Sequence, residues 1–225
     1  MSRINQCITN SFGVVYKLNQ NFEDCIHIAV KHIQHGNVIA IPTDTIYGLA
    51  ADVQNNDAIK KLYTIKGRTF MKPLSICVRD VNNIKNWGYV DHLPVQILEQ
   101  LLPGPVTVVL NRTPNLNSSF NHNIKKVGIR VPKNDFVQKL TSFLDTPIAL
   151  TSANKSNETS SVSIDEFSSF WNELNAIFDN GSIGKNRSGS TIIDLSEPGK
   201  YEIIRKGNYY SNTVQILKKF DFREK

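Results

Sequence analysis

The sequence predicts an α/β domain in which helices flank a mixed parallel and antiparallel sheet. Short, wholly apolar runs typical of buried strands alternate with stretches of helical periodicity along the whole chain. The 225 residues can bury one substantial core, and they contain no internal repeat or linker. Some connections between expected strands are too short for a helical crossover, which predicts that the sheet is mixed.

The helices are identified by apolar residues at helical spacing between start and stop signals. In the first helix, Ile26, Ala29 and Ile33 form an apolar stripe, and Gly36 follows the last turn. Ser163 and Glu166 fit an S-x-x-E capping box in front of a later helix. We expect helices at about residues 23–35, 58–65, 94–102, 135–144, 163–174 and 213–220.

The strands are expected where four or five residues, most of them apolar, lie between turn signals. The first such run is closed by Pro42, and another by Pro132. The expected strands are residues 38–41, 74–78, 106–110, 127–131, 147–150, 191–195 and 201–204.

The composition suggests an acidic partner, although the charge alone favours the alternative given below. The formal charge is +6 and the sequence pI is about 9.2, which suits a phosphate-bearing small molecule or a nucleic acid. The alternative is that a mild lysine excess only keeps a small protein in solution. No apolar run approaches the roughly 20 residues that cross a bilayer, so we expect a soluble chain without a membrane span.

The cysteines and the N-terminal residues bear on location. Cys7, Cys25 and Cys77 form no C-x-x-C pair and no zinc-ligand spacing, as expected for reduced thiols of an intracellular protein. The first 22 residues contain Arg3 and Lys17 but no acidic residue, a weak similarity to a mitochondrial presequence. We therefore expect a cytoplasmic protein, with a mitochondrial location as the alternative.

Polar residues that directly follow expected strands are the candidate ligand contacts, because open α/β sheets bind ligands beyond strand ends. The segment 42–48 offers small hydroxyls and a glycine to a polar ligand, or alternatively forms a turn that Asp44 caps. After the strand at 147–150, the residues Thr151, Ser152 and Asn154 suit an adenine edge or a phosphate. The sequence shows no His and Asp partners for a nucleophilic serine here.

Cationic residues are the second group of candidates. Lys66, Arg68 and Lys72 lie within seven positions interrupted by glycine and proline, which suits a loop that binds phosphate or carboxylate groups. Alternatively, they only complement the dipole at a helix C-terminus. Arg130 ends an apolar strand, where it either binds a ligand or pairs with a structural carboxylate.

Further candidates lie near the C-terminus. Gly189 and its neighbour Ser190 could form an anion-binding nest, and Arg205 ends the strand at 201–204. No Walker loop and no G-x-G-x-x-G motif is present. The histidines form no H-E-x-x-H or similar set, so no metal ligand is assigned.

Taken together, these segments resemble the YrdC-domain family of threonylcarbamoyl-AMP synthases, especially its eukaryotic branch. The matching segments are PTDTIYGLA at 42–50, KGR at 66–68, KPL at 72–74, LLPGPVTVVL at 101–110, VGIRVP at 127–132, LTSAN at 150–154, DNGSIG at 179–184, GSTIIDL at 189–195 and IIRKG at 203–207. The resemblance implies a twisted mixed sheet around a deep, basic cavity. It also implies a catalytic domain at 22–217, between an N-terminal arm at 1–21 and a C-terminal tail at 218–225.

The resemblance implies a nucleotidyltransferase that makes L-threonylcarbamoyl-adenylate and pyrophosphate from L-threonine, bicarbonate and ATP. A separate Kae/TsaD-type transferase would then modify the adenosine beside the anticodon of tRNAs that read ANN codons. Mg²⁺ would accompany ATP with no protein ligand assigned, and a weak tRNA contact is also expected. Fixed cations and N–H donors would offset the repulsion between carboxylate, carbamate and triphosphate, so that no nucleophilic side chain is needed.

The resemblance further implies roles for individual residues. Lys66 and Arg68 are the expected catalytic residues. The residues expected at threonine and bicarbonate are Thr45, Tyr47, Cys77, Arg130 and Ser190. Those expected at ATP are Arg68, Lys72, Thr151, Ser152, Asn154 and Arg205. Cys77 is a departure, since many microbial members carry a histidine there.

A non-catalytic RNA-binding protein that uses the basic cavity is the alternative function. The net charge favours it, but the basic residues cluster in motifs rather than along a stripe with interleaved aromatic residues. A binder would show salt-dependent tRNA binding without turnover. A synthase would release pyrophosphate only with both threonine and bicarbonate.

Overall fold

A computed structural model describes residues 12–67 and 73–225 of the chain. Within these residues, eleven strands form one sheet with parallel and antiparallel neighbours, so the predicted mixed α/β sheet is confirmed. The strands are β1 (Val15–Lys17), β2 (Ile39–Ile41), β3 (Gly48–Asp52), β4 (Ser75–Cys77), β5 (Val106–Asn111), β6 (Lys126–Arg130), β7 (Ile148–Ser152), β8 (Ala176–Asp179), β9 (Thr191–Asp194), β10 (Lys200–Arg205) and β11 (Arg223–Glu224). Their order across the sheet is β1-β8-β2-β3-β7-β4-β6-β5-β9-β10-β11.

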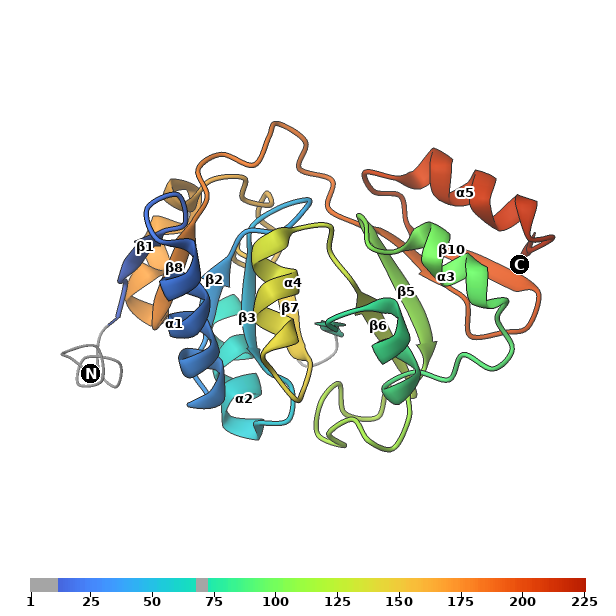
Figure 1. Ribbon diagram of the computed structural model, residues 1–225, viewed down its shortest axis with the longest axis horizontal. Helices are drawn as coiled ribbons and strands as arrows, with labels where there is room; N and C mark the ends of the chain where they lie inside the picture. Colours follow the sequence, from blue (N-terminus) through green and yellow to red (C-terminus); the bar gives the residue numbers. More distant parts are fainter. Residues whose placement is uncertain (1–11, 68–72) are drawn as a thin grey trace.

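Helices accompany both halves of the sheet (Figure 1). They are α1 (Phe22–Gln34), α2 (Asn56–Lys66), α3 (Val95–Leu101), α4 (Asp135–Ser142) and α5 (Tyr210–Lys219), with 3-10 helices η2 (Val81–Asn86) and η3 (Ile164–Glu173). One buried cluster joins α1 and α4 to the sheet, and a larger one joins α2, α3 and α5 to it. No helix in the described part of the chain is long and apolar enough to cross a membrane.

Helix α2 shows why most predicted helices form where the sequence places them. The Asn55 side chain accepts hydrogen bonds from the N–H groups of Asp57 and Ala58, both at 3.0 Å. Gly67 ends the helix at φ 55°, in the left-handed region that glycine enters without strain. This ending places Lys66, the last residue of α2, where its ammonium group reaches the carbonyls of Ser152 and Asn154 at the end of β7.

The predicted capping box at residue 163 is wrong in one part. The segment Ile164–Glu173 is a 3-10 helix, and the Ser163 side chain makes no capping hydrogen bond. The Glu166 carboxylate instead accepts from the N–H of Val162 at 2.9 Å and pairs with Arg187. Glu166 therefore ties the helix start to a distant segment rather than to a serine cap.

Both ends of the chain contribute strands that the sequence did not predict. β1 pairs in parallel with β8, and β11 pairs in parallel with β10. These strands have only three and two residues, too few to show a period. The division into arm, catalytic domain and tail stays a prediction, although strands lie within both the arm and the tail.

Candidate active site

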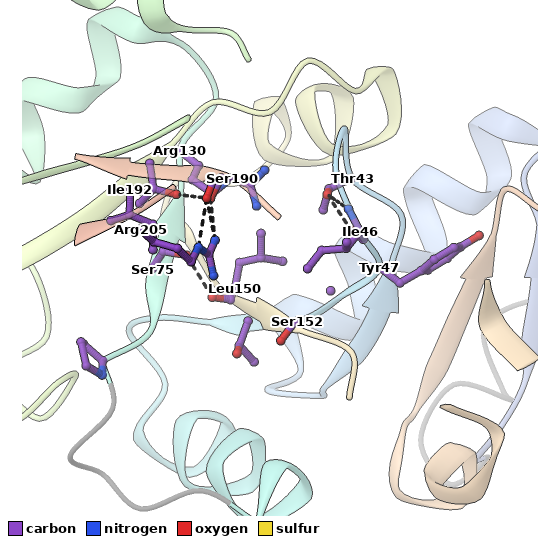
Figure 2. A pocket seen from close by; sticks show the side chains of 14 residues that line it. Thr43, Ile46, Tyr47, Ser75, Arg130, Leu150, Ser152, Ser190, Ile192 and Arg205 are labelled. Carbon is purple, nitrogen blue, oxygen red and sulfur yellow. Dashed lines mark hydrogen bonds between the residues drawn. The ribbon is translucent and has the colours of Figure 1, made fainter. Parts of the chain in front are cut away.

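A cavity of about 210 Å³ lies where loops and strands from both halves of the sheet meet (Figure 2). Hydroxyl groups and two guanidinium groups supply most of its polar atoms, and no carboxylate of the described residues lines it. The lining residues are Thr43, Ile46, Tyr47, Gly48, Pro73, Ser75, Thr107, Arg130, Leu150, Thr151, Ser152, Ser190, Ile192 and Arg205. Such a lining suits an anionic ligand with several hydrogen-bond acceptors.

Thr43 shapes the loop between β2 and β3 that forms one wall of the cavity. Its hydroxyl donates to the carbonyl of Ile46 at 2.7 Å and accepts from the N–H groups of Thr45 and Ile46 at 3.1 and 3.2 Å. Asp44 does not cap this turn, so that expectation is wrong. Its carboxylate points to β6, where Oδ1 accepts from Nη2 of Arg130 at 2.7 Å.

Arg130, the last residue of β6, combines the two alternatives that the sequence left open. It lines the cavity, and it also forms an ion pair with Asp44 in which the side chains are only 7% and 6% exposed. Nη2 donates to the hydroxyl of Thr45 as well, at 3.3 Å. The buried Nε atom has no acceptor among the described residues. An unpaired buried donor beside a cavity indicates a ligand that completes its hydrogen bonds.

Arg205, the last residue of β10, lines the same cavity, although it is also exposed to solvent. Its Nε and Nη2 atoms donate to the carbonyl of Ser190 at 3.1 and 2.8 Å, and Nη2 also donates to the Ser190 hydroxyl at 3.1 Å (Figure 2). Partial desolvation, and secondly the charge of Arg130, hold the pKa of Arg205 below its ordinary value. Two cations that are far apart in the sequence, Arg130 and Arg205, therefore line one cavity.

The hydroxyl groups of Ser190 and Thr107 are hydrogen-bonded to each other, which leaves one hydroxyl proton available to a ligand. Their oxygens are 2.7 Å apart, and Arg205 already donates to Ser190. The two hydroxyls carry two protons, of which one lies between them. The other proton can be donated to a ligand in the cavity that both residues line.

Close backbone packing fixes the position of Ser190. A Cβ atom on Gly207 would lie 2.3 Å from the carbonyl carbon of Ser190, closer than real Cβ contacts allow. The N–H of Gly207 donates to the Thr191 hydroxyl at 3.2 Å. The loop after β10 and the start of β9 can therefore lie side by side only because residue 207 is a glycine.

Lys66 supports the cavity instead of lining it. Its side chain is buried, and Nζ donates to the carbonyls of Ser152, at 2.7 Å, and of Asn154. Further contacts reach the Ser152 hydroxyl at 3.4 Å and the Asn154 side-chain oxygen at 3.3 Å. The ammonium group thus holds the turn after β7, while its catalytic role stays a prediction.

Neither the Tyr47 ring nor the Cys77 side chain is placed to contact a ligand in the cavity. The Tyr47 ring points away from the cavity (Figure 2), and its hydroxyl donates to the carbonyl of Gly181 at 2.7 Å and accepts from the N–H of Asn180 at 2.9 Å. Burial raises the pKa of Tyr47 to about 12. Burial likewise raises the pKa of the fully buried Cys77 thiol to about 12, and Cys77 is not among the lining residues. Both side chains are therefore neutral at physiological pH.

The structure brings together most, but not all, of the site residues expected from the sequence. The cavity is lined by Tyr47, Arg130, Thr151, Ser152, Ser190 and Arg205. Lys66 and Asn154 do not line the cavity but contact each other, and Lys66 also contacts Ser152, which does line it. Thr45 contacts Arg130. Arg68 and Lys72 lie outside the described residues.

Two hydroxyl residues of the lining, Ser75 and Thr107, were missed by the sequence analysis, and Thr43 was expected only as one of the small hydroxyls of the segment 42–48. Thr107 belongs to the segment 101–110, whose resemblance to the family could have drawn attention to it. Ser75 lies on β4 beside a matching segment, and its hydroxyl donates to the carbonyl of Leu150 at 3.1 Å. No sequence signal distinguished it from other strand serines.

Comparisons with known proteins identify the family. A family model named Sua5/YciO/YrdC, with the description telomere recombination, matches residues 31–207. The chain belongs to the Sua5/YciO/YrdC family. It is 41% identical over 199 residues to the threonylcarbamoyl-AMP synthases of Mus musculus and Homo sapiens, with 86% of this chain and 71% of each relative covered.

A solved structure agrees with this family. The crystal structure of Pyrococcus abyssi Sua5 complexed with L-threonine has a TM-score of 0.82 and 26% sequence identity to this chain. The match covers 94% of this chain but only 62% of the Sua5 chain. The predicted fold, the threonylcarbamoyl-AMP synthase function and the enzyme class are confirmed, and the RNA-binding alternative is not favoured.

Proposed function

We propose that this chain makes L-threonylcarbamoyl-adenylate and pyrophosphate from L-threonine, bicarbonate and ATP. The observation that carries this proposal is that Arg130 and Arg205, 75 positions apart in the sequence, line one cavity together with hydroxyl groups from several strands. The curated relatives carry the synthase name, and the Sua5 structure contains L-threonine. Both facts support threonine as the amino-acid substrate.

The reaction requires that several anions approach one another. The threonine nitrogen bonds to the carbon of bicarbonate, water leaves, and a carbamate results. A carbamate oxygen then attacks the α-phosphorus of ATP, and the bond from this phosphorus to the leaving pyrophosphate breaks. The repulsion among carboxylate, carbamate and phosphates must be offset by fixed cations and donors, which the two guanidinium groups and the hydroxyls can supply.

The proposed roles follow from the contacts. Arg130 binds the threonine carboxylate through the N–H groups that Asp44 and Thr45 leave unused. The spare proton of the Ser190 and Thr107 pair is donated to the same substrate.

ATP binds along the other part of the cavity. Arg205, Thr151 and Ser152 line this part and contact the nucleotide and its phosphates. Lys66 and Asn154 hold the turn that carries Ser152. Arg68 and Lys72, expected at the triphosphate from the sequence, and Cys77, expected near threonine, stay predictions.

Mg²⁺ is proposed as the companion of ATP. The described residues do not form a protein site for it, because no carboxylate lines the cavity and Asp44 is held by Arg130. No group of three or more His, Cys, Asp or Glu side chains in the described part of the chain could hold a metal ion. We therefore assign no ligand and no step of the reaction to the ion.

The product implies partners. A mixed anhydride of a carbamate and AMP is labile in water, so an acceptor must lie downstream. We propose that a Kae/TsaD-type transferase passes the threonylcarbamoyl group to tRNAs that read ANN codons, with at most a weak contact between tRNA and this chain. We propose a cytoplasmic location, with a mitochondrial one as the alternative.

The decisive measurement is pyrophosphate release by the purified chain with threonine and bicarbonate omitted in turn. We expect release only when both are present with ATP, and formation of threonylcarbamoyl-adenylate in equal amount. Release of pyrophosphate that ignores threonine or bicarbonate would contradict the proposal. Salt-dependent tRNA binding without any turnover would instead support the RNA-binding alternative.

A further inference from the structure

We propose that Asp44 is a positioning residue, which fixes the guanidinium group of Arg130 so that its unused N–H groups face the substrate carboxylate. Asp44 does not line the cavity itself. This inference rests on the proposed function, because it concerns the binding of threonine.

The contacts of Asp44 join the loop after β2 to the end of β6. Oδ1 accepts from Nη2 of Arg130 at 2.7 Å, and Oδ2 accepts from the backbone N–H of Lys133 at 2.9 Å. The Asp44 and Arg130 side chains are 6% and 7% exposed. Both carboxylate oxygens are therefore engaged within the protein, so Asp44 acts through Arg130 and not on the substrate.

The same contacts determine which part of Arg130 is left for a ligand. A guanidinium group has five N–H donors, and the two on Nη2 are used by Asp44 and Thr45. Of the remaining donors, Nε is buried and has no acceptor among the described residues. A carboxylate is the ligand that satisfies such donors best, since charge-assisted bonds to guanidinium are short and directional.

Asp44 also solves an electrostatic problem in the absence of substrate. Arg130 and Arg205 line one cavity, and their charges repel each other. Without a nearby anion, Arg130 would gain by moving towards solvent, where its charge is hydrated. The charge of Asp44 keeps Arg130 in place until the substrate arrives.

A positioning role and a simple charge effect predict opposite results for Asp44→Asn. This change removes one negative charge and so makes the cavity more attractive to anions. If only charge mattered, the KM for threonine would fall. If orientation matters, the weaker neutral hydrogen bond releases Arg130, and the KM for threonine rises by about 3- to 10-fold.

The experiment measures pyrophosphate release by the full chain, with threonine and ATP varied separately. For Asp44→Ala we expect the KM for threonine to rise about 10- to 100-fold, as for loss of a charge-assisted bond, with the KM for ATP within about 3-fold. Arg130→Ala gives the reference loss. The double variant should match Arg130→Ala within about 2-fold, because Asp44 has no effect once Arg130 is absent.

Glu166→Gln is the matched control, because Glu166 is also paired with an arginine but lies outside the cavity lining. Both KM values should stay unchanged in this variant. The positioning role is overturned if Asp44→Ala raises both KM values equally, if Asp44→Asn lowers the KM for threonine, or if the losses in the double variant multiply. If Asp44→Ala does not fold, Asp44→Asn and the double variant, which leaves no buried charge unpaired, decide the question.

The two proposals fail in different ways. If pyrophosphate release by the wild-type chain does not depend on threonine, the proposed function fails. If release depends on threonine, and Arg130→Ala raises its KM while the Asp44 variants do not, only the positioning role fails.

Discussion

Two arginine–carboxylate pairs, each with a contact of 2.7 Å, join distant segments of this chain but differ in burial and completeness. The pair of Arg187 and Glu166 is bidentate, and its side chains are 41% and 32% exposed. The pair of Arg130 and Asp44 has a single bond between the charged groups, and its side chains are 7% and 6% exposed.

This difference distinguishes an ion pair that only connects two segments from one whose arginine can bind a ligand. The exposed pair has the better geometry, yet solvent screens its charges, so it contributes little to stability. The buried pair loses more hydration and leaves the Nε donor of Arg130 unpaired, which is unfavourable unless a ligand uses this donor. Incomplete pairing in a buried position therefore indicates the binding site better than ideal pairing at the surface.

The largest effect is expected for Arg130→Ala. We expect kcat/KM for threonine to fall about 100- to 1000-fold, as when a fixed donor at a reacting centre is removed. The free energy of unfolding should also fall by about 3 kcal/mol, because Asp44 is left buried and unpaired. Steady-state kinetics and urea unfolding measure the two effects.

Arg187→Ala is the control for this comparison. It removes the arginine of the exposed pair, so we expect less than about 1 kcal/mol of lost stability and activity within about 3-fold. Equal losses in the two variants would show that burial does not distinguish the pairs.

Lys66→Met extends the comparison of the two arginine pairs to a buried cation whose partners are neutral carbonyl oxygens. The change should lower the free energy of unfolding by roughly 2 to 3 kcal/mol, since the carbonyls of Ser152 and Asn154 lose a charged donor. Denaturant unfolding and pyrophosphate release should decline together. A variant with wild-type stability but no activity would support the catalytic role expected from the sequence and contradict a supporting one.

Arg205→Gln tests whether an exposed arginine contributes little to substrate binding. Arg205 is exposed like Arg187 but has no carboxylate partner among the described residues, and it donates to the carbonyl of Ser190. We expect the KM for ATP to rise about 10-fold while stability changes by less than about 0.5 kcal/mol, because removal of one guanidinium group also relieves repulsion with Arg130. An unchanged KM for ATP would remove Arg205 from the proposed nucleotide contacts.

The sequence predicted which segments meet but not how their side chains point. Strands rich in β-branched residues, such as β5, were predicted within about one residue. β3 was missed because its sequence, GLAAD, has no β-branched residue, and it is a strand through pairing with β2 and β7. Gly48 permits this close pairing, since a Cβ there would lie 2.7 Å from Cδ1 of Leu150.

The site shows the same division. Residue types and family resemblance placed Arg130, Ser190 and Arg205 at one cavity, where the structure has them. The contacts of Asp44 and of Lys66 join residues 86 to 88 positions apart, so no local pattern could reveal them. The direction of a side chain depends on such long-range contacts, and local patterns in a single sequence do not reveal them.

The smallest effect is expected for Glu166→Gln, and its pH dependence sharpens the comparison at the surface. The hydrogen bonds from Arg187 lower the pKa of Glu166 to about 2 in the folded chain, against about 4.3 for a free glutamate. Because the folded pKa is the lower one, the stabilisation is present above about pH 4.3 and is lost as the pH falls towards 2. At pH 7 the variant should lose less than about 1 kcal/mol of unfolding free energy relative to the wild type.

Urea unfolding of both proteins between pH 7 and pH 2 measures this difference. It should shrink as the pH falls below about 4.3 and be largely lost near pH 2, where about half of the wild-type carboxyl groups are protonated. A difference that persists at pH 2 would mean that Glu166 acts through shape rather than charge. A loss of several kcal/mol at pH 7 would mean that an exposed pair can stabilise this fold as much as the buried one, and the contrast between Arg187 and Arg130 would then rest on the cavity alone.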